Sequence, residues 1–190
     1  YKNFMNEIGF DWHDDKYEYV LISIEIVETL SLIYTSSNTN HFILKPEWYD
    51  KALNIIKNKT NKPLMIIFYN NLNLNCEILY KYIEIFNKYG SIINNLENYV
   101  DKAQIKKMFI LSKVNHFIGS TNLVKLSSYI FSKENSITII NLNMFDNYQI
   151  NKKNYPNNWI ILDDYNYRIN SIKDIYKYKL NLVYNIEFIQ

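Results

Sequence analysis

The chain has 190 residues, of which 48% are hydrophobic and 16% aromatic, which is enough for one hydrophobic core. Its formal net charge is only +2, from 21 basic and 19 acidic residues spread along the sequence. No basic block could follow a phosphate backbone, so nucleic acid is not indicated as a partner. No stretch approaches the roughly 20 apolar residues needed to span a bilayer, and the first residues do not resemble a signal peptide.

Cys76 is the only cysteine, which excludes an internal disulfide and favours a cytoplasmic or other intracellular location. The same residue precedes a predicted helix, where a thiolate would be favoured, but a buried small hydrophobe is the preferred interpretation. The bias toward Asn, Ile, Lys and Tyr is typical of an AT-rich genome. Because the chain starts at Tyr1, we expect it to be part of a longer protein whose amino-terminal half is missing.

The first predicted strand covers residues 17–27, where β-branched side chains dominate and partly alternate with polar ones. A polar connection, residues 35–41, follows it. A helix is then predicted from Pro46, which suits the first helical position, to Lys59. Its expected buried stripe consists of Trp48, Ala52, Leu53, Ile55 and Ile56.

A nearly continuous apolar run, residues 64–69, predicts a strand that is buried on both faces. Residues 77–88 show helical spacing of apolar side chains, and Gly90 is a suitable stop for that helix. A short strand is predicted at residues 91–93.

The stretch from residue 101 to residue 140 contains a helix, a strand, a turn, a helix and a strand in direct succession. Residues 101–113 and 122–131 have helical spacing, and the apolar runs 115–118 and 136–140 are predicted strands. Gly119 opens the turn between them. Such a turn lies at the carboxyl end of a strand, where the free amides of the next helix favour an anion such as a phosphate.

Strands alternate with helices through most of the chain, up to a short apolar run at residues 159–162. This alternation predicts an α/β, Rossmann-like domain over residues 1–163, with a mostly parallel sheet and helices on both faces. Residues 164–190 are predicted to form an appendage packed on it, either an edge hairpin or a docking segment. Its tyrosine-rich part, residues 165–178, would be the place for a protein partner.

Three other sets of residues are of types that can serve in a functional site. His116 could act as an acid or base, but beside an apolar strand it is better explained as a hydrogen-bonded core residue. The cluster His13, Asp14 and Asp15 is contiguous, so its members are poorly placed to converge on one metal ion, and no metal site is predicted. Asp163 and Asp164 are adjacent on an extended chain and are expected to form a solvated strand end.

Residues 41–71, 108–131 and 155–161 resemble, in order and spacing, the carboxyl-terminal half of the α-1,2-fucosyltransferase-type glycosyltransferases of family 11. That family typically has a His-x-Arg-Arg-Gly-Asp-Tyr strand end, a Phe-Ser-Asp-Asp turn, an Asn-Ser-Ser-Phe-Ser-Trp-Trp element and a Pro-x-x-Trp-Ile close. The resemblance spans most of residues 17–162. It implies one Rossmann-like half of a GT-B-type enzyme and, as donor, a GDP-sugar, with no other cofactor.

The resemblance places the donor-binding residues in the turn and leaves the family's charged motifs unmatched. The turn residues are Gly119, Ser120, Thr121 and Asn122. Seven positions depart from the family's motifs. Glu25, Val27 and Glu28 stand in place of the histidine and arginine pair, and Asn70 and Asn71 in place of the aspartate pair. Lys125 and Leu126 replace the paired tryptophans.

Two functions follow from this comparison. Glutamates at a diphosphate site repel the donor, and the leaving group needs a cation that is normally arginine. The chain is therefore predicted to be a glycosyltransferase-like domain with a decayed donor site, a non-catalytic pseudoenzyme used as a structural or interaction module. The alternative is an active enzyme that moves fucose or a related sugar from a GDP-sugar to a glycan acceptor.

Overall fold

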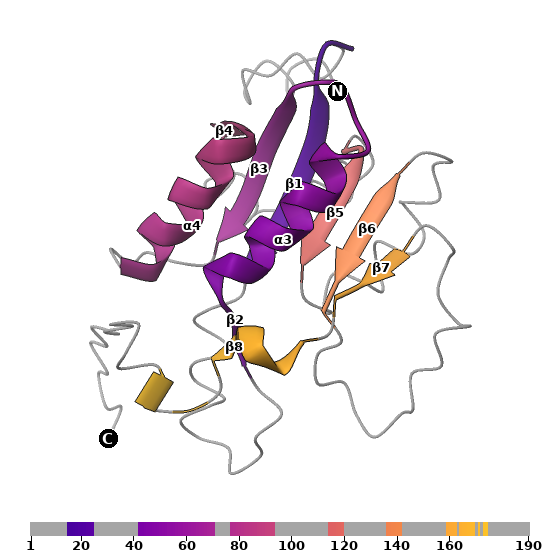
Figure 1. Cartoon of the computed structure of the whole chain (residues 1–190). Helices are drawn as coiled ribbons and strands as arrows, with labels where there is room; N and C mark the ends of the chain where they lie inside the picture. Colours follow the sequence, from indigo (N-terminus) through magenta and orange to yellow (C-terminus); the bar gives the residue numbers. More distant parts are fainter. Residues whose placement is uncertain are drawn as a thin grey trace, which may run out of the picture.

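A computed structural model of the chain shows a six-stranded sheet with helices packed against it (Figure 1). The structure describes residues 15–24, 42–70, 77–93, 114–119, 136–141, 159–162, 164–169, 171 and 173–174.

The large sheet is parallel throughout and has the strand order β4-β3-β1-β5-β6-β7. Its strands are β1 (Glu18–Ile24), β3 (Leu64–Asn70), β4 (Gly90–Ile93), β5 (His116–Gly119), β6 (Ile137–Ile140) and β7 (Trp159–Ile161). Counted along the chain within this sheet, the order is 3-2-1-4-5-6, which is the order of the doubly wound Rossmann fold. The predicted fold class is confirmed.

The strands at the centre of the sheet are buried on both faces. Six of the seven side chains of β1 are buried, and β5 and β6 are buried along their whole length. Such strands need apolar residues at consecutive positions rather than at every second one, which explains the runs that the sequence shows here. The order of the strands reverses between β1 and β5, where Val20 pairs with His116 and Ser23 with Gly119.

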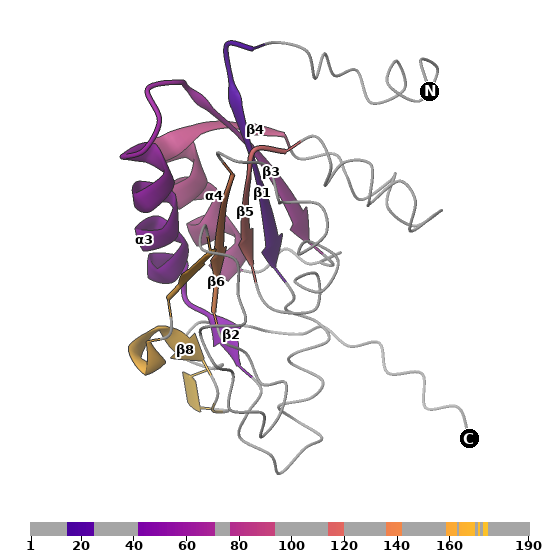
Figure 2. The same ribbon diagram turned by 90° about the vertical axis from the view of Figure 1, so that its right-hand side faces the viewer.

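Helices α3 (Pro46–Lys57) and α4 (Glu77–Tyr89) lie side by side on one face of the sheet (Figure 2). Pro46 starts α3 because a proline lacks the amide hydrogen that would be unsatisfied there anyway. The apolar faces of the two helices meet in a cluster of aromatic rings: Trp48, Tyr49, Tyr82 and Phe86. The helices predicted at residues 101–113 and 122–131 lie outside the described residues.

A second, two-stranded sheet joins a late segment of the chain to the start of α3. Strand β2 (Ile43–Leu44) pairs antiparallel with β8 (Arg168–Ile169), which follows a short 3-10 helix, Tyr165–Tyr167. Ile169 is fully buried in the main core. Figures 1 and 2 both place this pair beyond the arrowheads of the large sheet, at the edge where its strands end.

Two predictions differ from the structure, and a third is tested only in part. Gly119, predicted to open a turn, is the last residue of β5, because it still pairs with Ser23 and Ile140. The apolar run at residues 159–162 contains a strand, β7. The described part of β1 ends at Ile24, and residues 25–27 of the predicted strand lie outside the described residues.

The predicted boundary between a domain and an appendage at residue 163 stays a prediction. Within the described ranges, no helix is both long and apolar enough to cross a membrane.

Candidate functional site

The point where the strand order reverses lies between the carboxyl ends of β1 and β5. Ser23 of β1 pairs there with Gly119 of β5, which in turn pairs with Ile140 of β6. Open α/β sheets bind their ligands at this position, because the strands on either side connect in opposite directions and leave a crevice. The structure thus places Gly119, the first of the predicted donor-binding residues, at the expected edge. Ser120, Thr121 and Asn122 lie outside the described residues.

The glycine at position 119 has a packing role. A Cβ atom built on Gly119 would lie 2.8 Å from Cζ of Phe117 and 3.1 Å from Cβ of Ser23. The ring of Phe117 therefore uses the space that a side chain at position 119 would fill. This contact accounts for the glycine without a ligand, since a distance under about 3 Å between carbon atoms is repulsive.

Two buried hydroxyl groups lie on the same face of the sheet as Gly119. Ser23 pairs with Gly119, and Thr138 pairs with Phe117, so all four residues point away from α3 and α4. Both hydroxyls are fully buried, and neither has a hydrogen-bond partner among the described residues. An unsatisfied buried hydroxyl costs roughly 1–3 kcal/mol, so these two groups leave hydrogen-bonding capacity on this face that the described residues do not use.

The only arginine of the chain is held by two aromatic rings in the small β2–β8 sheet. The guanidinium carbon of Arg168 lies 4.2 Å from the centre of the Phe42 ring and 3.8 Å from that of Tyr165. Stacking between two rings fixes the guanidinium in the small β2–β8 sheet. The predicted requirement of a GDP-sugar site, an arginine at the diphosphate, is therefore not met by Arg168 as it stands.

The positions that depart from the family's motifs are only partly visible. Asn70 is the last residue of β3 and pairs with Ile24, so its backbone lies at the same carboxyl edge as Gly119. Glu25, Val27, Glu28, Asn71, Lys125 and Leu126 lie outside the described residues.

A groove of about 490 Å³ lies farther along the same edge, beyond the end of β7, and no pattern in the sequence predicts it. One wall comes from Trp48 and Lys51 of α3, and the other from residues 161–162 and 164–167. Nε1 of Trp48 donates to the carbonyl oxygen of Leu162 at 2.9 Å and thereby joins the two walls. These residues are 114 positions apart, so no local pattern could have revealed the contact.

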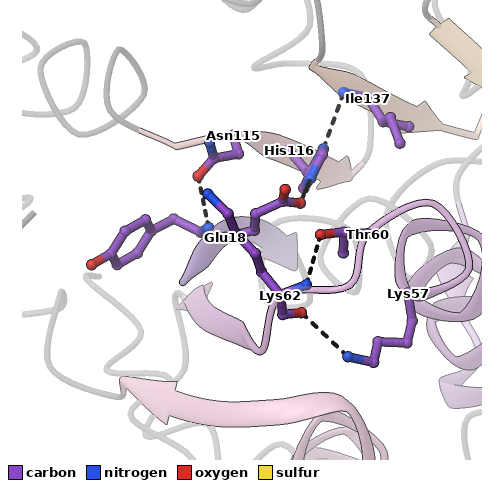
Figure 3. A network of polar contacts seen from close by, with 8 residues as sticks. Glu18, Lys57, Thr60, Lys62, Asn115, His116 and Ile137 are labelled. Carbon is purple, nitrogen blue, oxygen red and sulfur yellow. Dashed lines mark hydrogen bonds and ion pairs between the residues drawn. The ribbon is translucent and has the colours of Figure 1, made fainter. Parts of the chain in front are cut away.

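A polar cluster occupies the opposite edge of the sheet, where β1, β5 and β6 begin (Figure 3). Nε2 of His116 lies 2.6 Å from Oε2 of Glu18, and the backbone amide of Ile137 donates to Nδ1 of His116 at 3.1 Å. Burial lowers the pKa of His116, against the opposing effect of Glu18. The prediction that His116 is a hydrogen-bonded core residue is confirmed.

The remaining candidates provide no site in the described residues. Asp164 accepts a hydrogen bond from the amide of Asn166 at 2.9 Å and so caps the 3-10 helix. His13, Asp14, Cys76 and Asp163 lie outside the described residues. Across the part of the chain that the structure describes, no three His, Cys, Asp or Glu side chains are grouped closely enough to hold a metal ion.

Comparison of the chain with protein-family models, with curated proteins and with solved structures finds no match. The class of the protein thus comes from its own strand order, which defines a Rossmann-like α/β domain.

Proposed function

We propose that this chain is a glycosyltransferase-like domain of the α-1,2-fucosyltransferase type whose donor site no longer binds a GDP-sugar, and that it acts as a non-catalytic structural or interaction module. The observation that carries the loss of donor binding is the position of Arg168. The only arginine of the chain is stacked between the rings of Phe42 and Tyr165.

The strand order supports the ancestry in this proposal. A GT-B-type half has a Rossmann-like sheet, and ligands of such sheets bind where the strand order reverses. In this chain that point carries Ser23 and Gly119, a small polar residue and a glycine. These residues match the small polar residues that the resemblance implies at this turn, although the ring of Phe117 fills the space beside Gly119.

The charges support the loss of activity. Glu25 directly follows the last residue of β1, and Glu28 lies three positions farther on. At 4 Å, a carboxylate repels a phosphate charge by about 4 kcal/mol if the effective dielectric constant is 20. A backbone amide contributes only about 1 kcal/mol net per hydrogen bond, so several amides are needed to offset one glutamate.

The alternative is an active enzyme that transfers fucose or a related sugar from a GDP-sugar to a glycan. It is favoured by the position of Gly119 and by the unused hydroxyl of Ser23 at the same edge. As an interaction module, by contrast, the chain would use its tyrosine-rich residues 165–178, of which Tyr165 is 74% exposed. An intracellular location, favoured by the single cysteine, belongs to the same proposal.

Thermal unfolding with and without GDP or GDP-fucose tests the proposal. A ligand that binds only the native state raises the melting temperature by mass action. We expect no rise for the parent chain at about 1 mM ligand. The double variant Glu25→Gln/Glu28→Gln should show a rise, because it removes the repulsion, whereas Glu84→Gln on the exposed face of α4 should behave as the parent. A rise for the parent itself would favour the active enzyme.

A further inference from the structure

His116 connects three neighbouring strands through its two ring nitrogens. Its backbone belongs to β5, its Nε2 atom contacts Glu18, the first residue of β1, and its Nδ1 atom accepts from Ile137, the first residue of β6. The side chain is 4% exposed. Figure 3 shows the imidazole between the carboxylate and the amide, with Asn115 beside it bonded to the amide of Tyr19 at 2.8 Å.

The geometry requires one protonation state. A backbone amide can only donate, so Nδ1 must present its lone pair to Ile137. The ring hydrogen then resides on Nε2, where it is donated to the carboxylate of Glu18. A second proton could enter only at Nδ1, and it would replace an accepting nitrogen by a donor that faces another donor.

Three charged side chains lie at this end of the sheet among the described residues. From β1 comes Glu18, whose side chain is 21% exposed. From the turn before β3 comes Lys62, whose side chain extends toward Glu18 and Asn115 in Figure 3. Lys57, at the end of α3, bonds to the carbonyl of Lys62 at 3.2 Å. Within the described residues, Glu18 is the charged group that contacts the imidazole, and it favours the protonated ring.

We propose that His116 is an acid-sensitive clamp: the neutral imidazole ties the first residues of β1 and β6 to β5, and uptake of a proton at Nδ1 releases Ile137 and loosens β6. Strand β6 is only four residues long, so the loss of the bond at its first residue weakens a large part of its attachment. Strand β7 pairs only with β6 in the large sheet and loosens with it. Ile137 and Ile139 of β6 belong to the same buried cluster as the apolar residues of α3 and α4, so the loosening reaches that core.

Nuclear magnetic resonance of the full 190-residue chain, labelled with ¹⁵N, tests the clamp directly. At pH 7 the two ring nitrogens of His116 should show the neutral form with the hydrogen on Nε2. On acidification the ring should take up its proton below 6.5, the ordinary value of histidine, and the amide signal of Ile137 should change with the same midpoint. An imidazolium at pH 7, or a hydrogen on Nδ1, would overturn the proposal.

Urea unfolding at a series of pH values provides the second test. The sign follows from the lowered pKa of His116: the unfolded chain takes up the proton first, so stability is complete above pH 6.5 and is lost as pH falls below it. The unfolding constant of the parent should rise by up to tenfold per pH unit in this range. His116→Phe should remove that component, and the double variant His13→Gln/His41→Gln should keep it. If His116→Phe keeps the pH-dependent component, or if the double variant loses it, the clamp is refuted.

A third variant keeps the test decisive if His116→Phe does not fold. Glu18→Gln retains an acceptor for Nε2 but removes the negative charge that favours the imidazolium. The midpoint of the Ile137 signal should then shift to lower pH. No shift, or a shift to higher pH, would contradict the proposed role of Glu18 and with it the clamp.

Discussion

The ring of Phe117 fills the space in which a Cβ atom of residue 119, two positions farther along the same strand, would lie. A Cβ atom on the glycine would lie 2.8 Å from the ring's Cζ atom, so residue 119 can only be a glycine unless the ring moves. Both residues lie on the face of β5 that is turned away from α3 and α4. The contact therefore joins a residue of the candidate donor site, Gly119, to a buried side chain of the sheet, Phe117.

Gly119→Ala is predicted to destabilise the fold by about 1–3 kcal/mol, the usual cost of overpacking a core. The double variant Phe117→Leu/Gly119→Ala should recover part of the loss, because the shorter side chain frees the space. Urea unfolding measures both. Gly90 is the matched comparison, since its added Cβ would meet the backbone oxygen of Leu64, which a change of side chain cannot move. If Gly119→Ala is neutral, the ring adapts freely and the contact is unimportant.

Phe117→Ala and Ile118→Ala should each destabilise the chain by about 2–5 kcal/mol, because both side chains are fully buried on a central strand and would leave cavities. Melting and urea unfolding of the two variants give the values. Tyr80→Ala, on a residue that is 60% exposed on α4, should stay within about 0.5 kcal/mol of the parent. Unfolding of all three at the parent's midpoint would mean that β5 is not central.

The strands were predictable from the sequence because a strand buried on both faces is an apolar run of fixed length. Residues 64–69, 115–118 and 136–140 were all placed correctly to within about two residues. Their order in the sheet was not predictable, because burial patterns record how deep a strand lies and not which strand is its neighbour. The strands β2 and β8 were missed since each has only two residues, too few for any periodicity.

Arg168→Lys is predicted to destabilise the fold by about 1 kcal/mol, although the charge is kept. A flat guanidinium can stack on Phe42 and Tyr165 at once, whereas an ammonium group cannot cover both rings. Unfolding in urea measures the loss. Lys59→Arg, at an exposed position after α3, is the control for exchanging lysine and arginine where no ring is stacked, and it should leave stability unchanged. A neutral Arg168→Lys would show that the stack contributes little to stability.

Tyr89 should contribute a component of stability that disappears at alkaline pH. Its hydroxyl lies 3.0 Å from the backbone carbonyl oxygen of Asp50 and 3.1 Å from Oδ1 of its carboxylate, and burial together with this carboxylate raises the pKa of Tyr89 to about 12. In the unfolded chain the hydroxyl of Tyr89 ionises near pH 10. The stability that this hydroxyl contributes is therefore complete below pH 10 and is lost as pH rises toward about 12. The difference in unfolding free energy between the parent and Tyr89→Phe should shrink over this range. A constant difference would contradict the assigned hydrogen bond.

The candidate site was predictable only in part. Gly119 was found because a glycine at the end of an apolar run is a local signal. The contacts at this edge join residues that are far apart in the sequence. The guanidinium of Arg168 lies over the ring of Phe42, and Nε1 of Trp48 donates to the carbonyl oxygen of Leu162. Sequence spacing carries no information on such pairs. The chemistry of the glycine was also ambiguous, since the same absence of a side chain serves a ligand or a neighbouring ring.

The most direct test of the proposed loss of donor binding is calorimetry of the full chain with GDP-fucose at low salt. The account predicts no dissociation constant tighter than about 1 mM, which corresponds to about −4 kcal/mol. A micromolar constant that is abolished in Gly119→Ala but kept in Phe117→Leu, with both variants folded at the temperature of the experiment, would contradict it and establish a working donor site.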